Sequence, residues 1–302
     1  MTEASVSVWQ LRWRRLARDR VALGALSVLV LLYGLCFSAA WIEVWLDVTG
    51  VDTDLMSRFD PIDARHWLGS DEAGRDEFTR ILRGGQISLS IGLFAAIGSS
   101  FVGTVIGATA GYFRGRVDMV LMRFTDFMLA MPALPVLIIL AAIDLTKLGF
   151  SQDFVRSGAA GYWRIVLIVT LLGWTTVARL VRAATLSLVE REFVLAARAQ
   201  GASSLRILWV HVLPNAVTPI IVATTLRMGS VILTESALSF LGVGIQPPST
   251  SWGSMLTNAQ ELMASNPLLA VYPGAAILMA VIAINFVGDG LQSAFDPRAD
   301  PH

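Results

Sequence analysis

Two long stretches without a charged residue constrain the fold of this chain more than any other feature. Residues 21–42 and 84–113 contain no Asp, Glu, Lys or Arg. An α-helix rises 1.5 Å per residue, so about 20 apolar residues cross the hydrocarbon core of a bilayer. The first stretch also exceeds the apolar region of a signal peptide, about 7–15 residues, although arginines precede it. We therefore expect both stretches to be retained transmembrane helices.

The composition indicates the same class of protein. Hydrophobic residues make up 55% of the 302 positions and charged residues 15%, whereas soluble domains carry about 25% charge. Four further apolar stretches bring the expected number of transmembrane helices to six. The fifth helix is interrupted by Arg227 and Glu235. The sixth stretch is broken by Pro267 and Pro273, so its helix is expected to start near Pro273. The four stretches are residues 127–143 extended backward through Arg123 and Asp126, residues 165–178 flanked by Arg164 and Arg179, residues 217–241, and residues 263–288.

The arginines are distributed unevenly among the connecting segments. Five lie within residues 1–20, whereas residues 47–83 hold nine acidic residues against five arginines. By the positive-inside rule, the arginine-rich segments face the cytoplasm, and so do both termini. The expected organisation is a cytoplasmic arm at 1–20, a first transmembrane helix at 21–46, an extracytoplasmic loop at 47–83, a core of five transmembrane helices at 84–295 with a polar cytoplasmic loop at 187–214, and a tail at 296–302.

The polar loop contains the sequence EFVLAARAQGASSLRILWVHVLPN, residues 192–215. Its first part is rich in Ala, Arg and Leu, which favour helix. Gly201 accepts the left-handed conformation that follows a helix end, Ser203 is a capping residue for a second helix, and Pro214 marks its end or a bend. Phe193, Ala196, Ala197 and Gln200 are expected on one side of the first helix. Such a pair fits either a groove on another protein or the lipid headgroup layer.

Ionisable residues inside the membrane are costly and indicate function or pairing. Arg227 lies about 15 Å into the fifth span. It either lines a translocation path and attracts an anionic solute, or pairs with Glu235 or with an acid of a partner chain. Arg123 and Asp126 share a helix face and are expected to pair. Trp252 is expected to anchor the chain at the membrane interface.

Several kinds of chemistry are not indicated. A phosphate-binding P-loop needs glycines followed by Lys and then Ser or Thr, and Lys147, the only lysine, is followed by Leu148. ATP hydrolysis by that route is therefore excluded for this chain. His66 and His211 have no His, Cys or acidic partner at metal-ligand spacing, so no metal site is expected. Cys36 is the only cysteine and is expected to be a small packed hydrophobe.

Five segments resemble one protein family, in order along the chain. AARAQGAS followed by LP is similar to the "EAA" loop of permease subunits of ATP-binding-cassette importers. The other segments resemble the C-type permease subunit of the dipeptide, oligopeptide and nickel branch of that family. The quoted segments are HWLGSDEAGRDEFTRILRGGQISLSIGL, AGYFRGRVDMVLMRFTDFMLAMPALP, ARLVRAATLSLVEREFVLAARAQGAS, ESALSFLGVGIQPPSTSWGSML and YPGAAILMAVIAINFVGDGLQSAFDPR.

The resemblance implies an all-α integral membrane protein with the type I importer fold: six transmembrane helices and a cytoplasmic coupling helix. It implies a bacterial inner-membrane location and a translocation role without catalysis. The implied partners are a second permease, two ATP-binding subunits that bind ATP and Mg²⁺, and an extracytoplasmic solute-binding protein; membrane lipid surrounds the chain, and no nucleic acid is expected.

The resemblance also implies site residues. Leu195 stands where the motif has its name-giving Glu, so an ion pair made by that Glu is not expected here. A carboxylate is expected at Glu235, whereas members of the family usually carry a small or uncharged residue at the position of Arg227. The residues expected to contact the ATPase are Glu192, Ala196, Ala197, Arg198, Gly201, Ala202 and Ser203.

The substrate remains open at this stage. The resemblance favours di- and oligopeptides, with glutathione, nickel chelates or other small solutes as alternatives in the same transporter class. A secondary transporter is a remote alternative, since the chain lacks repeated halves with paired broken helices. An intramembrane serine protease is another remote alternative, because Ser203, Ser204 and His211 all lie in one loop rather than on facing transmembrane helices.

Overall fold

The computed structural model describes residues 13, 15–264 and 266–295, with the side chains of residues 148, 156, 258, 260 and 261 excepted. The expected arm at 1–20 and tail at 296–302 lie largely or wholly outside these residues. Within them the regular elements are helices, apart from one isolated bridge between Ser70 and Asp76. The helices are α2 (Arg20–Phe37), α3 (Ala39–Leu46), α4 (Glu77–Phe113), α5 (Gly115–Ala130), α6 (Ala133–Ala141), α7 (Gln152–Arg156), α8 (Gly158–Gly173), α9 (Thr175–Leu188), α10 (Glu192–Ala199), α11 (Ser204–Arg206), a π-helical segment (Ile207–Val212), α12 (Leu213–Phe240), α13 (Trp252–Leu262) and α14 (Leu268–Phe295).

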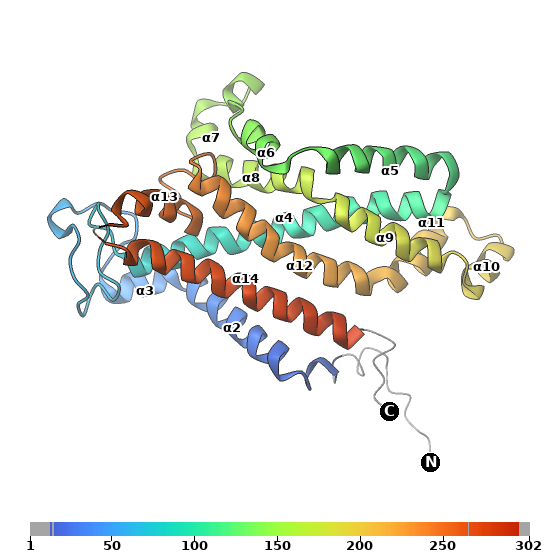
Figure 1. Cartoon of the computed structure of the whole chain (residues 1–302), viewed down its shortest axis with the longest axis horizontal. Helices are drawn as coiled ribbons and strands as arrows, with labels where there is room; N and C mark the ends of the chain where they lie inside the picture. The colour runs from blue at the N-terminus through green and yellow to red at the C-terminus, as the bar shows by residue number, and fades with distance from the viewer. Residues whose placement is uncertain (1–12, 14, 265, 296–302) are drawn as a thin grey trace, which may run out of the picture.

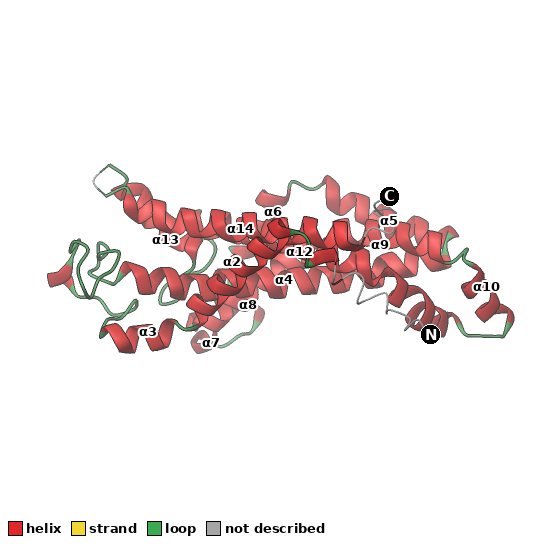
Figure 2. Ribbon diagram, turned by 90° about the horizontal axis from the view of Figure 1, so that it is seen from below, coloured by secondary structure: helices red, strands yellow, loops and turns green. Residues whose placement is uncertain are grey.

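The long helices run side by side along one axis, with α10 at one end of the molecule and α3 and α13 at the other (Figures 1 and 2). Four helical segments are long and apolar enough to cross a membrane: α2, α4, residues 204–240 and α14. Two bent pairs pass the same test, α5 with α6 at 85° and α8 with α9 at 45°. Counting each bent pair as one span gives the six transmembrane segments expected from the sequence.

Helix ends coincide with capping residues and breaks. Asp19 caps α2 by accepting from the backbone N–H groups of Val21 and Ala22, at 3.0 and 3.1 Å. Asp76 caps α4 by accepting from the N–H of Thr79 at 2.7 Å. Such side-chain oxygens bind donors that have no partner inside the helix. The expected first span at 21–46 is divided at Ser38, where α2 ends and α3 begins.

Helices α4 and α9 approach each other closely along a row of glycines. Gly103, Gly107 and Gly111 recur every four residues on the face of α4 that meets α9. A Cβ at Gly103 would lie 2.6 Å from the carbonyl oxygen of Trp174, and one at Gly107 would overlap the carbonyl oxygen of Ala178. Small residues at this spacing allow transmembrane backbones to pack against each other.

This close packing gives a first testable prediction. Gly107→Ala is expected to lower the free energy of unfolding by about 1–3 kcal/mol, because overpacking forces the two backbones apart. Gly24→Ala is the matched control, since a Cβ at Gly24 meets nothing within 4 Å. The measurement is denaturant unfolding of the purified protein in detergent. Equal unfolding free energies for the two variants would contradict the packing argument.

Two ion pairs join α5 to α9. Arg182 donates to both carboxylate oxygens of Asp118, at 2.5 and 2.6 Å, and Arg179 donates to Asp126 at 2.5 Å. The expected pair of Arg123 with Asp126 is therefore wrong. Asp126 turns instead to an arginine 53 positions later in the sequence, which local spacing on one helix does not predict.

The buried core also changes the interpretation of Trp252. This side chain is fully buried among α2, α4 and α14, and its indole N–H donates to the carbonyl oxygen of Ile81 at 2.8 Å. The expectation of an interfacial anchor is wrong, because a buried hydrogen-bond acceptor satisfies the polar edge of the ring. Cys36 packs in the same cluster, as expected.

Candidate functional site

The polar loop has the helix, glycine and helix arrangement that the sequence predicts. α10 ends at Ala199, and Gly201 follows in the left-handed region with φ of +80°. The N–H of Gly201 donates to the carbonyl of Arg198 at 3.0 Å, and that of Ala202 donates to Ala197 at 3.1 Å. These two bonds form a Schellman motif, which glycine at this position favours.

The second helix of the loop begins as expected but does not end at Pro214. Ser203 caps it by accepting from the N–H of Arg206 at 3.4 Å. The helix then passes through the π-helical segment Ile207–Val212 and continues into α12 without a break. Pro214 lies in the first turn of α12. Proline has no N–H to donate, and the π-helical turn just before it accommodates the missing hydrogen bond. Of the two outcomes expected at Pro214, an end or a bend, the structure excludes the end.

The loop has an inner face that packs on the bundle. Val194 is fully buried and Ala197 is 9% exposed, and Val194 belongs to a cluster with Ala108, Val181 and Ile207. The expectation that Ala197 shares the docking side with Phe193, Ala196 and Gln200 is therefore wrong, because it lies one turn after Val194 and faces the same way.

The outer face of the loop is exposed and partly apolar. Phe193, Leu195 and Leu205 are 42%, 49% and 67% exposed. We call these three residues with Ala196 the outer loop face. Of the other residues expected at the ATPase contact, Glu192, Arg198, Gly201 and Ser203 are exposed and Ala202 is half-buried. Sequence reasoning did not assign Leu195 or Leu205 to the ATPase contact, because the motif match covers only their neighbours.

Contacts to α4 and α9 hold the loop in position. The guanidinium of Arg198 lies over the ring of Tyr112, 5.7 Å from its centroid. Arg114, just after α4, donates to Glu190 at 2.8 Å. The loop is thus attached to the ends of two spanning helices and extends beyond them (Figure 2).

Glu235 lies near the other end of the bundle and is fully buried. Its carboxyl oxygens accept from the hydroxyls of Ser88 and Ser239, at 3.0 and 2.7 Å. The hydroxyl oxygen of Ser88 in turn accepts from the N–H of Trp252 at 3.2 Å. Glu235 therefore joins α12 to α4 and to the start of α13. Sequence reasoning missed both serines: Ser239 follows at i+4 on the same helix and was detectable, whereas Ser88 was not.

Arg227 does not pair with Glu235. The two residues are eight positions apart on α12, which separates them by about 12 Å along the helix axis. Arg227 instead donates from Nη1 to the hydroxyl of Ser230 at 3.2 Å. Its Nε is buried without a hydrogen-bond partner among the described residues. The structure does not bring the two intramembrane candidates together.

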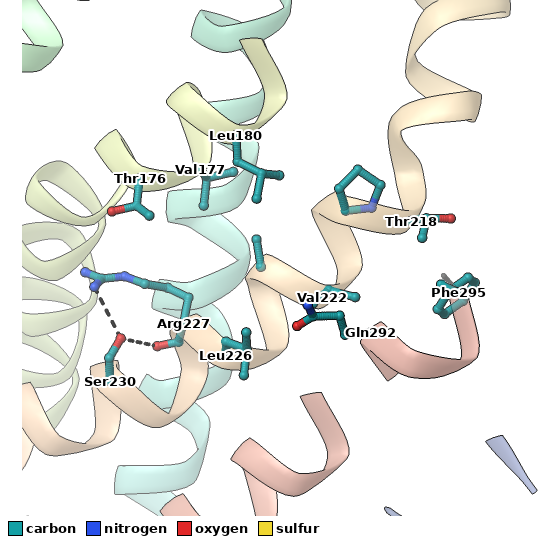
Figure 3. A pocket seen from close by; sticks show the side chains of 12 residues that line it. Thr176, Val177, Leu180, Thr218, Val222, Leu226, Arg227, Ser230, Gln292 and Phe295 are labelled. Atoms are coloured by element: carbon teal, nitrogen blue, oxygen red, sulfur yellow. Dashed lines mark hydrogen bonds between the residues drawn. The ribbon is translucent and has the colours of Figure 1, made fainter. Parts of the chain in front are cut away.

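Arg227 lines a partly open cavity of about 620 Å³ between α9, α12 and α14 (Figure 3). We call it the Arg227 cavity. Its polar lining side chains besides Arg227 are Thr176, Thr218, Ser230 and Gln292, and its apolar lining includes Val222 and Leu226. The volume is within the range of small-molecule sites, about 300–1,000 Å³.

Comparison with solved structures identifies the fold. A chain of the MetNI methionine ABC transporter, in an inward-facing conformation, superposes with a TM-score of 0.57 at 16% sequence identity, covering 72% of this chain and 97% of that chain. The bundle of spans with a loop at one end is therefore the fold of a type I ABC importer permease.

Sequence comparisons define the branch. The profile described as "Binding-protein-dependent transport system inner membrane component" matches residues 103–301, and that described as "N-terminal TM domain of oligopeptide transport permease C" matches residues 7–56. The chain belongs to the family of ABC importer permease subunits, in the branch of the dipeptide and oligopeptide C-type permeases. It is thus a multi-pass membrane protein of a family that works with ATP-binding subunits and a partner permease.

Individual relatives cover nearly the whole chain. A peptide permease protein of Brucella ovis is 38% identical over 91% of this chain and 87% of its own length. The dipeptide permease protein DppC of Alkalihalophilus pseudofirmus is 35% identical over 97% and 91%. The glutathione permease protein GsiD of Pectobacterium atrosepticum is 38% identical over 96% and 91%.

Proposed function

We propose that this chain is the non-catalytic translocation subunit of an ATP-driven importer of di- and oligopeptides. It lies in the bacterial cytoplasmic membrane with both termini in the cytoplasm. It pairs with a second permease, two ATP-binding subunits that hold ATP and Mg²⁺, and an extracytoplasmic solute-binding protein. Family membership supports the ATP-driven mechanism, and the arginine distribution supports the orientation.

The observation that carries the proposal is the outer loop face. It presents apolar side chains at one end of the bundle. The arginine-rich connections that follow α4 and α9 lie at the same end. Exposed apolar side chains on a helix mark a contact with a partner. Because Val194 holds the other side of α10 in the core, a force applied to α10 is transmitted to α4, α9 and α12.

The peptide substrate is supported by the relatives, which are named for peptide, dipeptide and glutathione transport. Glutathione is itself a tripeptide, so all three names describe solutes with a free carboxylate. A nickel chelate or another small solute is the alternative within the same class.

Site-directed crosslinking in membranes that contain the whole transporter tests the coupling role. Leu195→Cys and Ser203→Cys place thiols on exposed positions of the loop, and Val194→Cys places one on its buried side as the matched control. Cys36 is buried and contributes little background. A thiol-linked photocrosslinker at Leu195 or Ser203 is expected to capture the ATP-binding subunit, and the same label at Val194 is not.

Two results would count against the coupling role. Crosslinks that reach only phospholipid from both exposed positions would place the loop on the membrane surface. Equal capture of the ATP-binding subunit from Val194 would remove the assignment of an inner and an outer face.

A further inference from the structure

The guanidinium of Arg227 carries a charge that no acid of this chain compensates in the described structure. Within the described residues it makes one hydrogen bond, to Ser230, although a guanidinium has five N–H donors. The ion pairs that join helices of the bundle, such as Asp118 with Arg182, lie elsewhere. A cation held inside the membrane without a counter-charge is costly and marks a functional position.

The backbone around Arg227 leaves room for the guanidinium. It lies against Gly173, at the bend between α8 and α9. A Cβ at Gly173 would lie 2.9 Å from Nε and 2.7 Å from the hydroxyl of Ser99, and would overlap Nη2. Figure 3 shows the side chain extending from α12 toward the helix that carries Thr176. The absence of a side chain at residue 173 therefore lets the guanidinium pack against the end of α8.

The lining of the Arg227 cavity fits a solute with one anionic end. None of its lining side chains is acidic, and Arg227 is the one cation among them. The hydroxyl of Thr176 offers a further donor on the side toward which the guanidinium extends, whereas that of Ser230 is donated to the carbonyl of Arg227 at 2.7 Å. Val222, Leu226 and Phe295 offer apolar contacts further along. A carboxylate only accepts hydrogen bonds, and the planar fork of arginine binds its two oxygens together.

We propose that Arg227 forms a carboxylate-binding subsite on the translocation path, which holds the carboxylate end of the transported solute while its body lies along α12. The inference rests on the proposed function, since it assumes that solute passes this cavity. It assigns to this chain a contribution to selectivity, in addition to the selection made by the solute-binding protein.

The first test measures the electrostatic bias of the cavity directly. Thr176→Cys places a thiol near the guanidinium, and Thr218→Cys places one in the same cavity farther along α12. In membranes containing the assembled transporter, each thiol is titrated with a sulfonate-bearing and a trimethylammonium-bearing methanethiosulfonate. The anionic reagent is expected to be favoured at Thr176→Cys, and Arg227→Gln is expected to lower the anionic-to-cationic rate ratio about tenfold. The change at Thr218→Cys is expected to be smaller.

Two outcomes would overturn the subsite. A rate ratio near one at Thr176→Cys in the presence of Arg227 would mean that an acid of the partner permease already neutralises the guanidinium. A ratio that Arg227→Gln leaves unchanged would mean that the bias has another source, such as Arg179.

The second test measures transport by the complete importer with a solute that its binding protein accepts both as free acid and as C-terminal amide. Arg227→Gln is expected to lower the maximal uptake rate of the free acid about tenfold and that of the amide little. Arg227→Lys, which keeps the charge but loses the fork, is expected to be intermediate. Arg164→Gln is the matched control, because Arg164 is also half-buried with an unpartnered Nε, at another cavity near α7.

The readouts separate the two proposals. Equal loss for acid and amide after Arg227→Gln, with the parent importer active, overturns the subsite and leaves the coupling role intact. Loss of co-purification with the partner permease after Arg227→Gln also overturns it, since Arg227 would then serve assembly. An importer that fails to crosslink through the outer loop face refutes the coupling role but not the measured bias of the cavity.

Discussion

Glu235→Ala is expected to lower the free energy of unfolding by about 3–5 kcal/mol. The substitution removes a fully buried carboxyl group that accepts from Ser88 and Ser239. Each buried donor left without its acceptor costs about 1–3 kcal/mol, and the vacated volume adds a cavity term. Because Ser88 also accepts from the N–H of Trp252, the start of α13 is expected to loosen as well.

The measurement is unfolding of the purified protein in detergent, with proteolysis between α12 and α13 as a local readout. Glu235→Gln is the matched control: it keeps the shape and one acceptor oxygen, so its expected loss is below about 2 kcal/mol. An alanine variant as stable as the glutamine variant would show that the two serine contacts contribute little.

Val194→Asp is expected to abolish coupled uptake while the spanning helices remain assembled. Val194 is fully buried between α10 and the bundle, and a carboxylate buried there without a partner costs several kcal/mol. The chain avoids this cost by releasing α10 from its position. A cost of about 3 kcal/mol lowers the population of the docked loop roughly hundredfold.

Uptake, ATP hydrolysis and protease cleavage of the loop together check this expectation. Ala199→Asp is the matched control, because it introduces the same charge at an exposed position of the same helix. The expected pattern is rapid loop cleavage and lost uptake for Val194→Asp, with slow cleavage for Ala199→Asp. Slow cleavage of both variants would refute the role of Val194 in positioning the loop.

The local features of the loop could be predicted from the sequence, because they depend on neighbours within a few residues. Gly201 adopts the expected left-handed conformation, and Ser203 caps the next helix as expected. The six apolar stretches also correspond to the spans, since burial in lipid follows from composition over about 20 residues.

Features that depend on contacts between distant segments could not be predicted. Asp126 pairs with Arg179 rather than Arg123 because α5 lies beside α9. Trp252 is buried rather than interfacial because Gly85, far away in the sequence, leaves room for its ring; a Cβ there would lie 2.7 Å from the indole. Local spacing carries no information about such neighbours.

The backbone that Arg227 contacts could not be predicted from the sequence either. The bend at Trp174 divides the fourth span into α8 and α9, and uniform hydrophobicity across residues 165–178 gave no sign of it. The bend nevertheless determines which backbone the guanidinium meets.

Helix α9 has one further consequence. It begins at the bend beside Arg227, and three residues separate its end at Leu188 from the start of α10 at Glu192. Its 14 residues, about 21 Å of helix, extend from the proposed anion contact toward the proposed motor contact. The glycine row of α4 packs against α9 along most of its length. We therefore expect a tilt of α10 to pass through the short connection 189–191 and along α9 to the Arg227 cavity, so that the two proposed roles would depend on the same helix.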